Sequence, residues 1–211
     1  MSLARGVSTT PFTRPAQVLE LKTDITDSSS VAGALATVKE EYGSAHGLIN
    51  VAGVHRGGRV DDLSREDWDL VLTTNLTGAF EMCKATVPIL EPGSSIVNVG
   101  AVVGFRGFPG DVAYGSAKAG LSGLTQVLAA ELAPRDIRVN LVIPRFCGYR
   151  HDLGTQRPGA GACRLVHPGR TYRRPEEIAQ VIVDVALSTY MYGAIVPVDG
   201  GLMNTFSGGG R

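Results

Sequence analysis

Apolar residues recur along the chain with two alternating periods. Short apolar runs of strand length alternate with longer stretches in which apolar residues return every three to four positions. The short runs predict strands over residues 18–22, 47–51, 95–99, 137–143 and 194–198, and the longer stretches predict helices over 29–42, 64–90, 112–133 and 175–187. Strands that alternate with helices of this length are typical of a parallel sheet covered by helices on both faces.

Residues at the predicted helix starts support these boundaries. Ser64 and Asp67 have the spacing of a capping box at the start of the helix over 64–90. Pro175, followed by Glu176 and Glu177, places a proline and two carboxylates in the first turn of the last helix, where both favour a helix N-terminus.

The pattern predicts one α/β domain. We expect an irregular leader over residues 1–16 and a doubly wound, Rossmann-like parallel sheet over 17–211. Ligands of such sheets bind beyond the carboxyl ends of the strands. The segments that follow residues 51, 99 and 143 are therefore expected to line any site.

Composition narrows the classes of function. The 211 residues are 44% hydrophobic and 19% charged, which suits one globular domain with a substantial core. The formal net charge is zero, so the prediction is a small-molecule partner, with no nucleic acid and no membrane. Neither a membrane-spanning run nor a secretory signal pattern occurs, which favours a cytoplasmic location. Cys83, Cys147 and Cys163 lack a disulfide framework and fit reduced thiols.

Tyr114 and Lys118 could form a proton-transfer pair. They lie four residues apart near the start of a predicted helix, so both side chains project from one face. A neighbouring ammonium favours the phenolate and is expected to bring the pKa of Tyr114 down from about 10. The same spacing is common in surface pairs, so the surrounding sequence has to decide between the two interpretations.

The surrounding sequence holds further motifs in a specific order. They are Asn50-Val51-Ala52-Gly53 after a strand, Asn75-Leu76-Thr77-Gly78 within a helix, Ile96-Val97-Asn98-Val99 on the next strand, and Tyr114-Gly115-Ser116-Ala117-Lys118-Ala119-Gly120. Together they resemble the classical short-chain dehydrogenase/reductase family, and most closely its 3-oxoacyl-carrier-protein reductase-like members. The resemblance runs from about residue 22 to 144 and resumes over 174–177 and 197–201.

This resemblance implies an oxidoreductase that interconverts carbonyl and hydroxyl groups with NADP or NAD, with a 3-oxoacyl thioester as the substrate class. By the family's pattern, Tyr114 protonates the carbonyl oxygen, and Lys118 also holds the nicotinamide ribose. Asn75 matches a helix asparagine that anchors a water in the proton relay. From its residue type alone, Asn75 could equally be a helix residue bonded to a backbone carbonyl.

The resemblance also implies a cofactor surface and an oligomer. Its cofactor-binding positions are Asp24 and Ile25 beside the adenine, Asn50, Ala52 and Gly53 on the adenosine side, Tyr114 and Lys118 at the nicotinamide ribose, and Pro144. Asn50 and Gly53 could also be only a strand-end turn. Family members form dimers or tetramers through their two long helices, here 64–90 and 112–133, and through the C-terminal strand, so a homo-oligomer is expected.

Two departures from the family pattern support a second interpretation. The family's catalytic serine lies thirteen residues before the tyrosine, and this position holds Ala101. A preorganised donor of that kind contributes about 10²-fold or more in rate, and neither Ser95 nor Ser116 is expected to replace it. Nothing before residue 17 supplies a glycine-rich phosphate turn, so we expect the fold to lack its first strand-helix-strand unit. The alternative is an N-terminally truncated, catalytically impaired or inactive homologue that acts only as an oligomer subunit.

Residues 145–173 break the periodicity of the chain. They are rich in Arg, Gly, Pro, Cys and His, and our hypothesis is that two compensating frame shifts bracket them. Their Cys147-x-x-x-His151 and Cys163-x-x-x-His167 spacing could supply four zinc ligands, but the usual hairpin and helix pattern is missing, so no metal site is expected. His46 and His55 are isolated and are interpreted as exposed loop residues.

Overall fold

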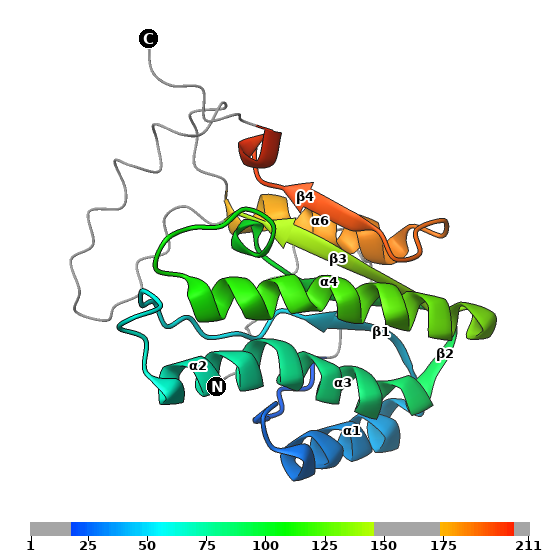
Figure 1. Cartoon of the computed structure of the whole chain (residues 1–211). Helices are drawn as coiled ribbons and strands as arrows, with labels where there is room; N and C mark the ends of the chain where they lie inside the picture. The colour runs from blue at the N-terminus through cyan, green and yellow to red at the C-terminus, as the bar shows by residue number, and fades with distance from the viewer. Residues whose placement is uncertain (1–17, 146–173, 205–211) are drawn as a thin grey trace.

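The structure is a computed structural model that describes residues 18–145 and 174–204. It contains a parallel sheet in the order β1-β2-β3-β4 (Figure 1). The strands are β1 (Ala45–Asn50), β2 (Leu90–Val99), β3 (Arg138–Pro144) and β4 (Ile195–Val198). The leader over residues 1–16, the segment 146–173 and the Cys/His spacing within it lie outside the described residues.

Helices cover both faces of the sheet, as the sequence predicted. The helices are α1 (Ser28–Tyr42), α2 (Arg65–Leu72), α3 (Gly78–Thr86), α4 (Val112–Leu132) and α6 (Pro175–Leu187). Figure 1 shows α4 and α3 in front of the sheet and α6 behind it. The observed architecture is therefore the expected doubly wound, Rossmann-like α/β fold.

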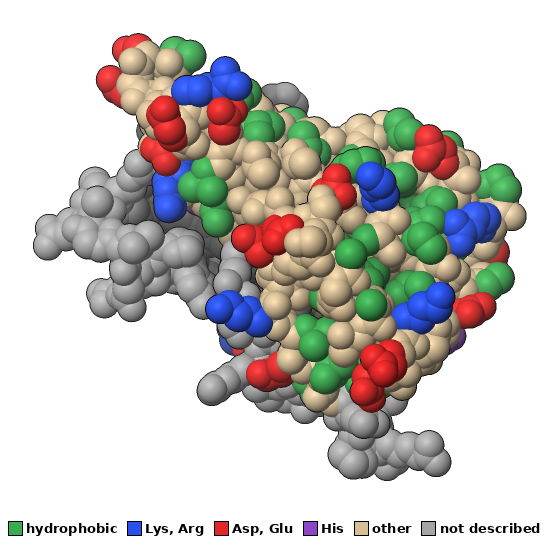
Figure 2. Space-filling view, turned by 90° about the horizontal axis from the view of Figure 1, so that it is seen from below, with side chains coloured by type: hydrophobic (Ala, Val, Ile, Leu, Met, Phe, Trp, Pro, Cys, Tyr) green, Lys and Arg blue, Asp and Glu red, His purple; other side chains and the backbone are tan. Residues whose placement is uncertain are grey.

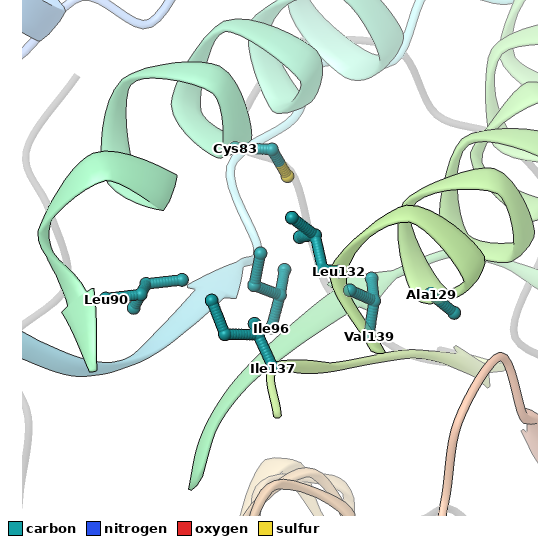
Figure 3. Packing of buried hydrophobic residues seen from close by; sticks show 7 residues of the cluster. All are labelled: Cys83, Leu90, Ile96, Ala129, Leu132, Ile137 and Val139. Carbon is teal, nitrogen blue, oxygen red and sulfur yellow. The ribbon is translucent and has the colours of Figure 1, made fainter. Parts of the chain in front are cut away.

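The alternation of side chains along the strands produces the two packed layers. Ile96 on β2 and Val139 on β3 face one layer, where they pack with Cys83 of α3 and Leu132 of α4 (Figure 3). The next residue of β2, Val97, faces the opposite layer, which includes Ile178, Ile182 and Val185 of α6. Each fully buried aliphatic side chain of this kind contributes roughly 1.5–3 kcal/mol relative to its exposed state.

Two sequence predictions about elements are wrong. Residues 18–22 form no strand, because a strand needs a hydrogen-bonded neighbour and β1 pairs only with β2 among the described residues. The predicted single helix over 64–90 is interrupted by a π-helical turn at Thr73–Thr77. It also ends earlier, since Pro88 lies in a 3₁₀ turn (Val87–Ile89) and Leu90 already begins β2.

Several helix boundaries agree with the expected caps. The Ser64 hydroxyl accepts a hydrogen bond from the backbone N–H of Asp67 at 3.0 Å, which caps α2. At α6, the backbone N–H of Arg174 donates to the Glu177 carboxylate at 2.8 Å. The Arg138 guanidinium on β3 donates to the carbonyls of Ala186 and Ser188 and thereby ties the C-terminal end of α6 to the sheet.

The described surface carries charges of both signs. Figure 2 shows Lys and Arg side chains interspersed with Asp and Glu side chains on one face of the molecule. Among the described residues, every helix is too short or too polar to cross a membrane.

Candidate active site

The candidate site lies where β1 and β2 end beside the first turns of α4. The two strands are in parallel register, with Asn50 opposite Asn98, so their carboxyl ends reach the same edge of the sheet. The chain then continues through Gly53 after β1 and through Ala101 after β2. Both segments therefore reach the part of α4 that carries Tyr114 and Lys118.

Lys118 is the buried cation of the site. Its side chain is 4% exposed, and its ammonium donates to the carbonyl of Val99 at the end of β2 at 2.8 Å. Burial lowers the pKa of Lys118 from 10.5 to about 8, because desolvation disfavours the charged form. An ammonium has three donors, and this hydrogen bond is the one that the described residues show for Lys118.

Tyr114 lies one helical turn from Lys118, as predicted. The lysine nitrogen is 5.6 Å from the centre of the phenol ring. The expectation that Lys118 lowers the pKa of the tyrosine is wrong for this structure. Burial raises the pKa of Tyr114, and the negative charge of Asp111 raises it further. Tyr114 is therefore a protonated phenol at neutral pH.

Asn75 lies in the π-helical turn between α2 and α3, 1% exposed. Its amide nitrogen donates to the carbonyls of Val54 at 2.7 Å and Val71 at 2.9 Å. Its carbonyl oxygen accepts from the backbone N–H of Val54 at 3.2 Å. The side chain thus fixes the loop that follows β1 by bonding to backbone groups, as its residue type alone allowed. The role of Asn75 in anchoring a water stays a prediction.

Gly53 is the position where these residues converge. A Cβ atom there would lie 2.4 Å from the Asn75 side-chain oxygen and 3.7 Å from the Lys118 nitrogen. Any side chain at residue 53 would therefore displace Asn75. The glycine permits a close approach of the loop after β1 to the asparagine and the lysine, which a simple strand-end turn would not require.

Ala101 is the second residue of the loop between β2 and α4. Its carbonyl accepts a hydrogen bond from Gly104 at 3.0 Å, and a Cβ atom at Gly104 would lie 2.6 Å from the backbone nitrogen of Ala119. The loop thus lies directly against α4. Ser116 donates to the Val112 carbonyl of its own helix, and the Ser95 hydroxyl is buried within β2. The structure gives no sign that either serine takes the place of residue 101.

The remaining predicted cofactor residues occupy different environments. Asp24 is exposed, and hydrogen bonds from the backbone and hydroxyl of Thr26 lower its pKa. Ile25 lies close to Gly78, where a Cβ atom would be 2.9 Å from the isoleucine side chain. These contacts place the segment after residue 22 over the start of α3.

The side chain of Asn50 is directed into the fold. It donates to the Asn98 side chain at 2.9 Å and to the Cys83 sulfur at 3.3 Å. Asn98 in turn donates to the Thr125 hydroxyl at 2.9 Å, which links β1, β2 and α4 through buried polar groups. The two other predicted positions, Ala52 and Pro144, lie at strand ends, half-buried and buried respectively.

The structure also shows two residues that sequence reasoning missed. His55, interpreted above as an isolated loop residue, bonds through Nε2 to the Asp111 carboxylate at 2.7 Å. Its ring packs edge-on against Tyr114, with the ring centres 5.0 Å apart. The available signal was their position in the chain, since His55 follows Gly53 by two residues and Asp111 precedes Tyr114 by three.

Together, the fold and the site define a Rossmann-like protein with a tyrosine–lysine pair at the carboxyl edge of its sheet. The family described as enoyl-(acyl carrier protein) reductase matches residues 6–203 of the chain. A 3-oxoacyl-acyl-carrier-protein reductase of Thermotoga maritima is 37% identical over 194 residues, which cover 90% of this chain and 78% of that protein. Carbonyl reductase family member 4 of Danio rerio is 40% identical over 186 residues, covering 87% and 77%.

Solved structures agree with these sequence matches. A short-chain dehydrogenase of Burkholderia cenocepacia in complex with NADP has a TM-score of 0.80 and 30% identity, and the match covers 86% of this chain and 75% of that one. A short-chain dehydrogenase/reductase mutant of Serratia marcescens has a TM-score of 0.80 at 28% identity, with the same coverage. The chain belongs to the short-chain dehydrogenase/reductase family and is an oxidoreductase of that family.

Proposed function

We propose that this protein reduces the ketone of a 3-oxoacyl thioester with NADPH or NADH. The observation that carries the proposal is the convergence of a protonated Tyr114, a buried Lys118 and Asn75 beside Gly53. The substrate class is supported by the Thermotoga maritima relative, a 3-oxoacyl-acyl-carrier-protein reductase. The Danio rerio relative, a carbonyl reductase, supports the coarser reaction of carbonyl reduction.

The hydrogen-bond donors of Lys118 fit the nicotinamide ribose of a dinucleotide cofactor. Beyond its bond to the Val99 carbonyl, the lysine ammonium has donors left for the ribose hydroxyls. When bound, the reduced nicotinamide supplies the hydride. The described residues contain no glycine-rich turn that leads from a strand into a helix, so we assign them the ribose contact and not the pyrophosphate contact.

Tyr114 serves as the general acid in this proposal. A phenol is protonated at neutral pH and can donate its proton to a carbonyl oxygen, and burial raises the pKa of Tyr114 further above that range. The Lys118 nitrogen lies 5.6 Å from the centre of the phenol ring, so the group assigned to the ribose and the general acid are neighbours. Asn75 holds the loop after β1 in place beside the lysine and thus acts as a positioning residue.

A specific observation also supports a second candidate, a catalytically impaired or inactive homologue. Ala101 has no hydroxyl to orient the carbonyl, and neither Ser95 nor Ser116 supplies one in this structure. Such a protein would act as an oligomer subunit. Exposed apolar side chains on the two long helices, such as Phe80 on α3 and Val127 on α4, support a dimer or tetramer in either case.

The decisive experiment is a substrate and cofactor panel. Purified protein is assayed by nicotinamide absorbance with NADPH and with NADH against a 3-oxoacyl thioester and a simple ketone of matched size. The matched 3-hydroxyacyl thioester is assayed in the reverse direction with NADP+ and NAD+. Consumption of reduced cofactor with the 3-oxoacyl thioester, faster than with the simple ketone, supports the reductase. Absence of turnover with both cofactors, from protein that unfolds cooperatively and sediments as an oligomer, supports the inactive subunit.

A further inference from the structure

The His55–Asp111 pair lies next to the proposed acid Tyr114 and is not used in the mechanism above. Its hydrogen bond is 2.7 Å long, and the side chains are 38% and 25% exposed. Lys118 is buried, whereas both members of the pair are partly exposed to solvent. The partly exposed groups beside the Tyr114 ring therefore include this pair.

Backbone contacts hold the pair in place. The N–H of Gly58 donates to the carbonyl of Gly110 at 2.8 Å, and Gly58 forms a parallel bridge with Asp111. The loop after β1 is thereby attached to the start of α4. The position of His55 beside Tyr114 is thus fixed by backbone hydrogen bonds as well as by its own side chain.

Asp111 does not make the contact that an aspartate usually makes at this position. It is the N-cap residue of α4, yet its side chain caps none of the free backbone N–H groups of the helix. The carboxylate bonds to His55 instead. The local preference of aspartate is overridden by a contact between residues 56 positions apart, which points to a role at the site.

The negative charge of Asp111 acts at the phenol. It raises the pKa of Tyr114, second only to burial among the causes of that shift. A substrate carbonyl that accepts a proton from the phenol has to approach the same oxygen, so its substituents lie within the same field. Because a carboxylate only accepts hydrogen bonds, Nε2 of His55 is the donor in this pair.

We propose that His55 and Asp111 form a specificity-determining pair beside Tyr114. The pair favours carbonyl substrates that carry a hydrogen-bond donor or a positive charge near the carbonyl, and it disfavours substrates that carry a carboxylate there. This inference rests on the proposed carbonyl reduction. Within the loop after β1, Arg56 pairs with Asp67 of α2 at 3.6 Å, so these two charges largely compensate. Asp111 is the carboxylate whose charge acts on the phenol.

The test uses three ketones of matched size that bear an ammonium, a neutral or a carboxylate substituent. For the wild-type protein, kcat/KM is expected to be about five- to tenfold higher for the ammonium ketone than for the carboxylate ketone. Asp111→Asn keeps an oxygen acceptor for His55 but removes the charge, so the preference should disappear, mainly through KM. His55→Gln retains the carboxylate and should retain the preference against the carboxylate ketone.

Asp69→Asn on α2 is the matched control, because Asp69 pairs with Arg65 on an exposed helix face. If Asp111→Asn keeps the wild-type preference, or Asp69→Asn loses it, the proposal is wrong. If no variant turns over any ketone, the proposed function fails, and the inference is tested on binding alone. The same three ketones are then titrated into the protein by ligand-observed NMR, and equal dissociation constants for the ammonium and carboxylate ketones would overturn it.

Discussion

Asn75 and Val54 exchange two hydrogen bonds: the asparagine amide donates to the valine carbonyl at 2.7 Å, and the valine N–H donates to the asparagine oxygen at 3.2 Å. This exchange joins the π-helical turn to the loop after β1. Both backbone groups of Val54 depend on one side chain, so the shape of the loop beside the lysine depends on it as well.

Replacing Asn75 by Ala should destabilise the protein by about 2–4 kcal/mol, because buried backbone groups of Val54 and Val71 lose their partner. Asn75→Asp should be at least as destabilising, since a carboxylate cannot donate to two carbonyls. Urea unfolding of the three proteins measures both effects. A loss below about 1 kcal/mol for the alanine variant would contradict this role.

A methyl group at residue 53 should disturb the site, whereas one in α1 should not. Gly53→Ala places a Cβ atom 2.4 Å from the Asn75 oxygen, so either the loop or the asparagine has to move. Gly33 has no atom within 4 Å of its Cβ position. Gly33→Ala should stabilise the helix by roughly 0.5–1 kcal/mol. If Gly53→Ala has a higher melting temperature than Gly33→Ala, the geometry at residue 53 is contradicted.

The lowered pKa of Lys118 predicts that the free energy of unfolding depends on pH. The folded-state pKa is about 8, below the ordinary value of 10.5, so between these limits the unfolded chain binds a proton that the native state lacks. The free energy of unfolding should therefore rise with pH across this window, by about 3 kcal/mol relative to Lys118→Met. Lys39→Met, at an exposed lysine of α1, provides the baseline. If the free energies of unfolding of the wild type and of Lys118→Met change with pH in parallel, the lowered pKa of Lys118 is disproved.

Restoring a hydroxyl at residue 101 should accelerate the proposed reduction. Ala101→Ser places a donor on the loop that packs against α4 through Gly104, and a donor aimed at the carbonyl is worth about 10²-fold in kcat. Steady-state kinetics with a 3-oxoacyl thioester measure the gain. Val103→Ser on the same loop is the control, and an equal gain in both variants would show that the position of the hydroxyl does not matter.

Periodicity predicted most of the fold, but local pattern could not reveal pairing. Residues 18–22 have the composition of a strand, yet a strand is defined by its neighbour, which the pattern does not contain. The π-helical turn at Thr73–Thr77 is similarly invisible to a period of 3.6 residues. Asn75 of this turn bonds to Val54 in the loop after β1, a tertiary contact that the local pattern does not contain.

The site was also predicted only in part, because the sequence pattern reveals local contacts but not contacts between distant residues. Tyr114 and Lys118 are one helical turn apart, so their proximity follows from local geometry and was found. The contact of His55 with Asp111 spans 56 positions and was missed. The direction of the Tyr114 pKa shift was also wrong, because burial is its largest cause and burial cannot be read from helical spacing; Asp111, three residues before the tyrosine, adds to it.

The most direct test of the account compares Tyr114→Phe with Tyr190→Phe in the reduction of a 3-oxoacyl thioester by NADPH. Tyr190 is 96% exposed and lies between α6 and β4, so it serves as the matched control. Removal of the general acid should lower kcat/KM by about 10²-fold or more, with the fold intact by thermal unfolding, while the Tyr190 variant keeps wild-type kinetics. Equal activity of the two variants would contradict the assignment of Tyr114 as the acid.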